Sequence, residues 1–65
     1  MFIKLTDLDG EKVFINVSRI MFIVPYSTRG YTEASTVYMN SDAYMKVSES
    51  PDMILKLIER SENGT

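Results

Sequence analysis

The stretch Arg19-Ile20-Met21-Phe22-Ile23-Val24-Pro25 decides how the rest of the chain is arranged. Residues 20–24 are five consecutive apolar residues in a chain of only 65. A strand with one face in water alternates between apolar and polar residues, whereas an unbroken apolar run is typical of a strand covered on both faces. Pro25 has no N–H for a ladder and marks the end of a strand or an edge. The stretch therefore predicts a central strand over residues 20–25.

A β-hairpin is predicted before this strand. Residues 2–7 and residues 11–17 both alternate between apolar and polar side chains, which is a strand pattern. Asp9-Gly10 lies between the two runs, and Gly adopts the positive φ that a tight turn needs. The first third of the chain is therefore expected to fold as two antiparallel strands.

The chain beyond the central strand predicts a loop and a second hairpin. The loop covers residues 26–32, with Arg29-Gly30 as its turn residues. Alternation resumes over residues 33–40 and again over residues 43–48. The polar cluster at residues 40–42 is turn chemistry and separates these two strands.

The C-terminal part of the chain predicts a helix over about residues 51–61. Ser50 is a good N-cap, and Pro51 suits the first helical position because its missing N–H has no intrahelical partner to lose. The apolar stripe of this helix is Met53, Ile54, Leu57 and Ile58. The expected fold is α+β: a small, mainly antiparallel sheet of about five strands, two hairpins around the central strand, with the helix on one face.

Sorting the strand residues by parity separates aliphatic from aromatic side chains. The aliphatic set is Ile3, Leu5, Val13, Ile15, Met21, Ile23, Val37, Met39, Met45 and Val47. We expect the helix to cover this face, with Met21 and Ile23 in contact with it. The other face then stays open and is larger than a lone monomer usually tolerates. Its candidate interface residues are Phe2, Phe14, Ile20, Phe22, Val24, Tyr38 and Tyr44.

The length of the chain favours self-association. A single core of this size supplies about 3–5 kcal/mol, so a small domain commonly depends on disulfides, a metal or a second copy. The 65 residues include neither cysteine nor histidine, which excludes disulfides and thiolate or imidazole zinc sites. A homo-oligomer that acts through protein–protein contacts is therefore the main functional hypothesis.

A nucleic-acid-binding module is the alternative hypothesis. Bases stack on exposed aromatic rings beside basic groups in many single-strand binding proteins. The candidate contacts for this role are Lys4, Arg29, Tyr31 and Lys46. The net charge of −2 disfavours it, because nucleic-acid-binding modules are usually basic.

Catalysis, metal binding and membrane insertion have little support in the sequence. The most common catalytic groups are histidine and cysteine, and the chain has neither, so we expect no enzyme and no cofactor. Asp7-x-Asp9-x-Glu11 resembles a string of calcium ligands, but it is shorter than an EF-hand loop and is expected to be a solvated turn. The sequence shows neither a signal peptide nor an apolar span of membrane length, and we expect a cytoplasmic protein.

Several segments resemble a known family. They are Lys4-Leu5-Thr6, Leu8-Asp9-Gly10, Val13-Phe14-Ile15-Asn16, Phe22-Ile23, Thr36-Val37-Tyr38-Met39, Tyr44-Met45-Lys46-Val47 and Ser48-Glu49-Ser50-Pro51. Together they resemble the small FlbD-like proteins found among bacterial flagellar genes, over most of the chain. The resemblance implies a small non-enzymatic accessory or regulatory protein, either flagellar or a diverged phage or mobile-element relative.

Overall fold

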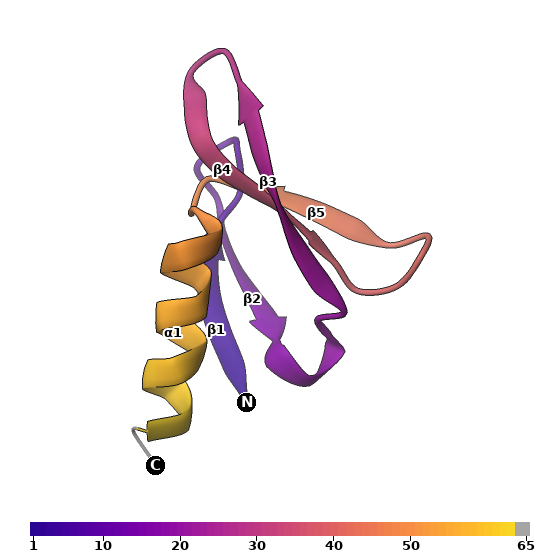
Figure 1. Ribbon diagram of the computed structural model, residues 1–65, viewed down its shortest axis with the longest axis vertical. Helices are drawn as coiled ribbons and strands as arrows, with labels where there is room; N and C mark the ends of the chain where they lie inside the picture. The colour runs from indigo at the N-terminus through magenta and orange to yellow at the C-terminus, as the bar shows by residue number, and fades with distance from the viewer. Residues whose placement is uncertain (64–65) are drawn as a thin grey trace.

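The computed structural model describes residues 1–63 and shows strands followed by one C-terminal helix (Figure 1). The elements are β1 (Phe2–Thr6), β2 (Lys12–Asn16), the 3₁₀-helix η1 (Val17–Arg19), β3 (Phe22–Thr28), β4 (Tyr31–Tyr38), β5 (Tyr44–Val47) and α1 (Pro51–Asn63). All paired strands are antiparallel. The α+β class is confirmed, and the arrangement of the strands differs from the expected one.

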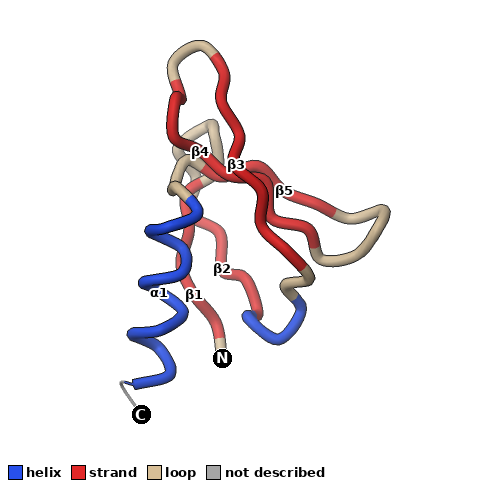
Figure 2. Tube along the Cα trace, in the orientation of Figure 1, coloured by secondary structure: helices blue, strands red, loops and turns tan. Residues whose placement is uncertain are grey.

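The strands form two sheets instead of the single sheet expected (Figure 2). One sheet is the β1–β2 hairpin, and the other has the order β3-β4-β5. The sheets meet where Asp7 forms one bridge with Val47 and the Ser48 N–H donates to the Thr6 carbonyl at 2.7 Å. This junction stays short because the chain leaves β5 there and begins α1 at Pro51.

The central strand is β4, and the prediction that residues 20–25 are central is wrong. β3 is the edge strand of its sheet and begins only at Phe22. Ile20 lies at the end of η1 and packs against the core, whereas Met21 is 57% exposed. The apolar run begins at the C-cap of η1 and enters β3 only at Phe22, so it does not represent one strand with two covered faces. The fully buried run is instead Ala34-Ser35-Thr36-Val37 of β4.

The loop predicted over residues 26–32 is mostly strand. β3 extends to Thr28 and β4 begins at Tyr31, which leaves Arg29-Gly30 as a two-residue turn. Gly30 has φ +92°, a conformation that other residues rarely adopt. A β-bulge between Tyr26 and Thr28 interrupts the alternation in this hairpin and explains why its sequence does not show a regular period of two.

The core lies between the inner faces of the two sheets and one side of α1. Its buried cluster is Ile3, Leu5, Ile15, Val37, Val47 and Ile54. Ile54 is fully buried, and Leu57 and Ile58 pack against the same cluster. Met53 was predicted on this stripe but is 48% exposed. Met21 does not join the core either, whereas Ile23 packs against it.

The segment before α1 ties the helix to both sheets. The Thr6 N–H donates to Glu49 Oε1 at 2.9 Å, and Ser35 Oγ donates to the Glu49 carbonyl at 2.7 Å. Ser50 Oγ accepts from the Met53 N–H at 3.2 Å, so the predicted N-cap is confirmed. In the described part of the chain, no helix is long and apolar enough to cross a membrane.

Candidate protein-interaction surfaces

Three aromatic side chains form a row across the outer face of the three-stranded sheet. The strand register sets Phe22 beside Tyr38 and Tyr38 beside Tyr44, one residue from each strand. The Phe22 and Tyr38 ring centroids are 4.5 Å apart with an interplanar angle of 21°. The Tyr38 and Tyr44 centroids are 5.5 Å apart at 41°. We call these three residues the aromatic row.

The aromatic row is ordered by its own packing but open to solvent. Phe22 is 45% exposed and Tyr44 is 56% exposed, while Tyr38 between them is half-buried. Stacked and tilted ring pairs at these distances attract one another, so the rings lose little further freedom when a partner covers them. Large apolar groups gathered in this way are typical of interaction sites.

The residues that follow the aromatic row on the same face make contacts with one another. Val24 lies beside Thr36, and Thr36 lies beside Lys46. The Lys46 ammonium lies 4.5 Å from the centroid of the Tyr26 ring, which is a cation–π contact. This part of the face is therefore mixed in character, and the apolar surface is concentrated at the aromatic row.

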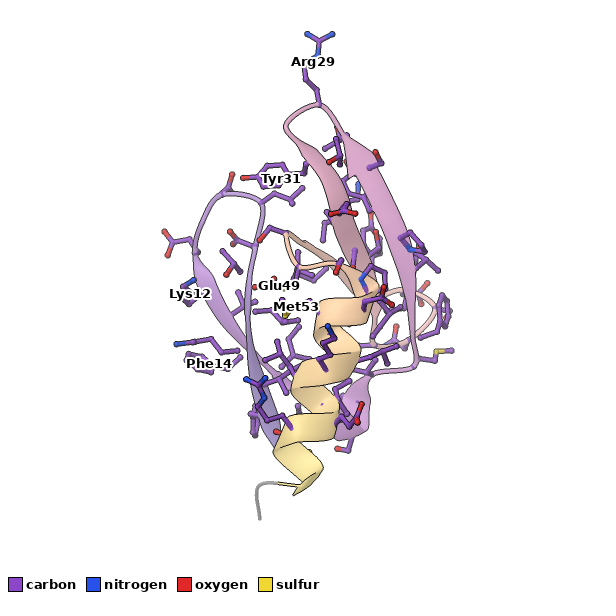
Figure 3. The ribbon with its side chains drawn as sticks, turned by 60° about the vertical axis from the view of Figure 1, so that its left-hand side comes forward. Lys12, Phe14, Arg29, Tyr31, Glu49 and Met53 are labelled. Atoms are coloured by element: carbon purple, nitrogen blue, oxygen red, sulfur yellow. The ribbon has the colours of Figure 1, made fainter. Side chains whose placement is uncertain are left out.

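A second exposed patch lies on the outer face of the β1–β2 hairpin. Phe2 is 62% exposed and Phe14 is 66% exposed. Phe14 lies directly across from Lys4, and the Lys12 ammonium donates to Thr6 Oγ1 at 3.0 Å. Figure 3 places Phe14 and Lys12 at the outer margin of the molecule. We call Phe2 and Phe14 the hairpin patch.

The expected single interface is therefore divided between two surfaces. Both sheets turn their inner faces to one core, so their outer faces point away from each other. Phe22, Val24, Tyr38 and Tyr44 lie on the outer face of β3-β4-β5, and the hairpin patch lies on β1–β2. Ile20 belongs to neither surface because it packs against the core.

The candidate nucleic-acid contacts are not brought together. Lys4 lies on the hairpin and Lys46 on β5, whereas Arg29 projects from the tip of the β3–β4 turn (Figure 3). The Tyr31 hydroxyl donates to the Leu8 carbonyl at 2.7 Å, so this ring joins two hairpins instead of facing a ligand. These residues form no continuous basic track along which a phosphate backbone could lie.

The acidic string at residues 7–11 is used by its own turn. Asp7 Oδ1 accepts from the Asp9 N–H at 2.8 Å and from the Glu11 N–H at 2.9 Å. This is the local capping that Asp commonly provides in turns. Within residues 1–63, no group of three or more His, Cys, Asp or Glu side chains is placed to hold a metal ion.

One groove was not predicted from the sequence. It has a volume of about 390 Å³ and lies between the β3–β4 hairpin and the start of α1. Tyr26, Ala34 and Pro51 contribute apolar walls, and Glu33 and Asp52 bring two carboxyl groups to its lining. The groove depends on the docking of residues 48–51 against β4, which no local sequence signal indicates.

Comparison with protein-family models, curated proteins and solved structures finds no match to this chain.

Proposed function

We propose that this chain is a small non-catalytic accessory protein that works in a self-associated form, with the aromatic row as a contact surface between copies. The observation that carries the proposal is the set of three rings in contact, of which a single copy leaves the outer two, Phe22 and Tyr44, open to solvent. The FlbD-like resemblance supports an accessory or regulatory role over a catalytic one.

The small size of the core supports the same proposal. Each large apolar side chain that moves from water into a fully buried site contributes about 1.5–3 kcal/mol. Phe22 is 45% exposed and Tyr44 is 56% exposed in one copy, so about half of that contribution is still available to each. A partner that covers both rings adds stability comparable with the few kcal/mol expected from a core of this size.

Sedimentation velocity across the micromolar range tests the proposal. The wild-type protein is expected to sediment as an oligomer, and the double variant Phe22→Ser/Tyr44→Ser as a smaller species. Leu55→Ser is the matched control, because Leu55 is 56% exposed on α1 and lies outside the aromatic row. A wild-type protein that stays monomeric throughout this range would contradict the proposal, provided that circular dichroism shows it to be folded.

Nucleic-acid binding is the competing outcome and has its own test. Fluorescence anisotropy with labelled single-stranded and duplex DNA at low salt is expected to show no binding, because the basic side chains are dispersed and the net charge is −2. Salt-sensitive binding that disappears in Lys46→Ala, with the fold retained, would favour the alternative function.

A further inference from the structure

Two strands lie at the outer ends of this fold, and they differ in what their free edges present. Through the Asp7–Val47 bridge the five strands follow the order β2-β1-β5-β4-β3, so β2 and β3 are the outermost strands. An unpaired edge carries N–H and C=O groups that can pair with another strand. In an antiparallel ladder every second residue bonds to the neighbouring strand, and the residues between them point their N–H and C=O groups to the free edge.

In β2 the outward backbone groups belong to Lys12, Phe14 and Asn16. The Asp7 N–H donates to the Glu11 carbonyl at 2.9 Å, and the Val17 N–H donates to the Met1 carbonyl at 2.9 Å. Because hydrogen-bonded pairs alternate along an antiparallel ladder, the odd-numbered residues of β2 bond to β1 and the even-numbered residues face away from it.

Within the described residues, no backbone hydrogen bond outside the β1–β2 ladder occupies these outward groups of β2. Figure 3 places Lys12 and Phe14 at the outer margin of the molecule, away from α1. The edge is therefore both unpaired and accessible along its length.

In β3 the same reasoning places Ile23 and Pro25 on the free edge. The Met39 N–H donates to the Ala43 carbonyl at 2.8 Å, so the odd-numbered residues of β4 bond to β5 and the even-numbered residues bond to β3. Pro25 presents no N–H at this edge, and the bulge between Tyr26 and Thr28 distorts it further. Both features are known to discourage edge-to-edge pairing, and β2 has neither of them.

We propose that two copies of this chain pair antiparallel along their β2 edges, about a two-fold axis that passes beside Phe14. The inference rests on the proposed self-association and adds a second surface to the aromatic row. The two hairpins then form one continuous four-stranded sheet, β1-β2 of one copy followed by β2-β1 of the other.

The sequence of β2 is suited to such a two-fold axis. About a two-fold axis at Phe14, each residue before Phe14 faces the residue at the same distance after Phe14 in the second copy. The two halves of the strand must therefore complement each other. Lys12-Val13-Phe14-Ile15-Asn16 reads polar, aliphatic, aromatic, aliphatic, polar from either end. The register centred on Phe14 pairs the whole of β2 and satisfies every outward N–H and C=O of the strand.

The side chains agree with this register on both faces. On the outer face, Phe14 lies across from Phe14 of the second copy, where two rings exposed by 66% cover each other. Lys12 lies across from Asn16 of the second copy, so no two like charges face each other. On the inner face, Val13 lies across from Ile15 of the second copy.

A single cysteine tests the register directly, because the chain has no cysteine of its own. Across the axis the two Phe14 Cα atoms are about 5.5 Å apart in a hydrogen-bonded pair, which is within the range of a disulfide. Phe14→Cys treated with diamide, which takes up the two electrons and two protons of the thiol pair, is expected to become a covalent dimer. Phe2→Cys is the control, because Phe2 is similarly exposed at 62% but lies more than three strand spacings, or about 14 Å, from its copy.

Phe14→Pro tests the pairing without a cross-link. The Phe14 N–H is not used by the β1–β2 ladder, so proline at this position leaves the hairpin bonds intact but blocks the edge. We expect the mass of the assembly to fall by half relative to wild type. Phe14→Lys, which keeps the N–H but sets two charges against each other, is expected to do the same should the proline variant fail to fold.

The outcomes separate this inference from the proposed function. Slow cross-linking of Phe14→Cys, no faster than that of Phe2→Cys, or an unchanged mass in both Phe14→Pro and Phe14→Lys, would overturn the β2 pairing. If the aromatic-row variant were then monomeric, the proposed function would stand without it. A monomeric wild type would overturn both.

Discussion

The two outermost strands, β2 and β3, show two different ways in which a short chain handles an unpaired edge. β3 carries Phe22, one end of the aromatic row, on its face, while Pro25 and a bulge block its edge. β2 carries Phe14 on its face and has no proline or bulge along its edge. The comparison indicates that contact through β3 is restricted to the face, whereas β2 offers both a face and a backbone edge.

The largest expected effect comes from the core that both regions share. Ile54→Ala removes a fully buried side chain and is expected to lower the free energy of unfolding by about 2–5 kcal/mol, which is close to the whole stability of a core this small. Urea denaturation followed by circular dichroism measures this loss. Both modes of association should disappear with the fold, and a stable Ile54→Ala variant would show that the helix contributes little.

Removing the block on β3 is expected to change association more than stability. Pro25→Thr restores an N–H at the free edge and leaves the β3–β4 ladder intact, because position 25 faces away from β4. We expect assemblies larger than those of the wild type, measured by light scattering at matched concentrations. Combining it with Phe14→Pro should move the pairing from β2 to β3. An unchanged mass in Pro25→Thr would show that the proline does not protect this edge.

A charge within the aromatic row is expected to be tolerated by the fold. Phe22 lies on an edge strand and is 45% exposed, so Phe22→Asp loses mainly the stacking against Tyr38, which is worth about 0.5–1.5 kcal/mol. The variant should stay folded by circular dichroism and should lose the row-mediated contact by sedimentation. Complete unfolding of Phe22→Asp would show that this strand is more deeply packed than its exposure indicates.

The smallest expected effect concerns the connection between the two regions. Tyr31→Phe removes the hydrogen bond to the Leu8 carbonyl and should lower the free energy of unfolding by about 0.5–1.5 kcal/mol. Its sedimentation should match that of the wild type, because Tyr31 belongs to neither contact surface. A change in oligomeric state would mean that the relative position of the two hairpins controls association.

The sequence predicts the local elements of this fold well. Asp9-Gly10 indicates the first hairpin, and Gly10 adopts the expected positive φ of 89°. Ser50 indicates the start of the helix through its capping side chain. Parity sorting also separates the residues correctly within each sheet, because one register sets Phe22, Tyr38 and Tyr44 on a single face. These features depend on neighbours in sequence or on a period of two.

The rest depends on contacts between distant parts of the chain. The junction of the two sheets depends on Thr6, which accepts from the Ser48 N–H and donates its own N–H to Glu49 Oε1, and no pattern in the sequence indicates these contacts. The run at residues 20–24 misleads because Ile20 is the C-cap of η1, which ends at Arg19, and the strand begins only at Phe22. Contacts between distant residues also divide the expected interface residues between two surfaces. The groove beside α1 depends on such contacts too, and no sequence signal indicates it.

Residue-resolved amide hydrogen exchange tests the central claim about the two edges most directly. The Phe14 and Ile23 amides both face away from their own sheets, so in an isolated copy both should exchange fast, while Val13 stays protected by β1. Raising the protein concentration is expected to slow exchange at Phe14 and leave Ile23 fast. Equal, fast exchange of Phe14 and Ile23 at every concentration would contradict the pairing of β2 edges.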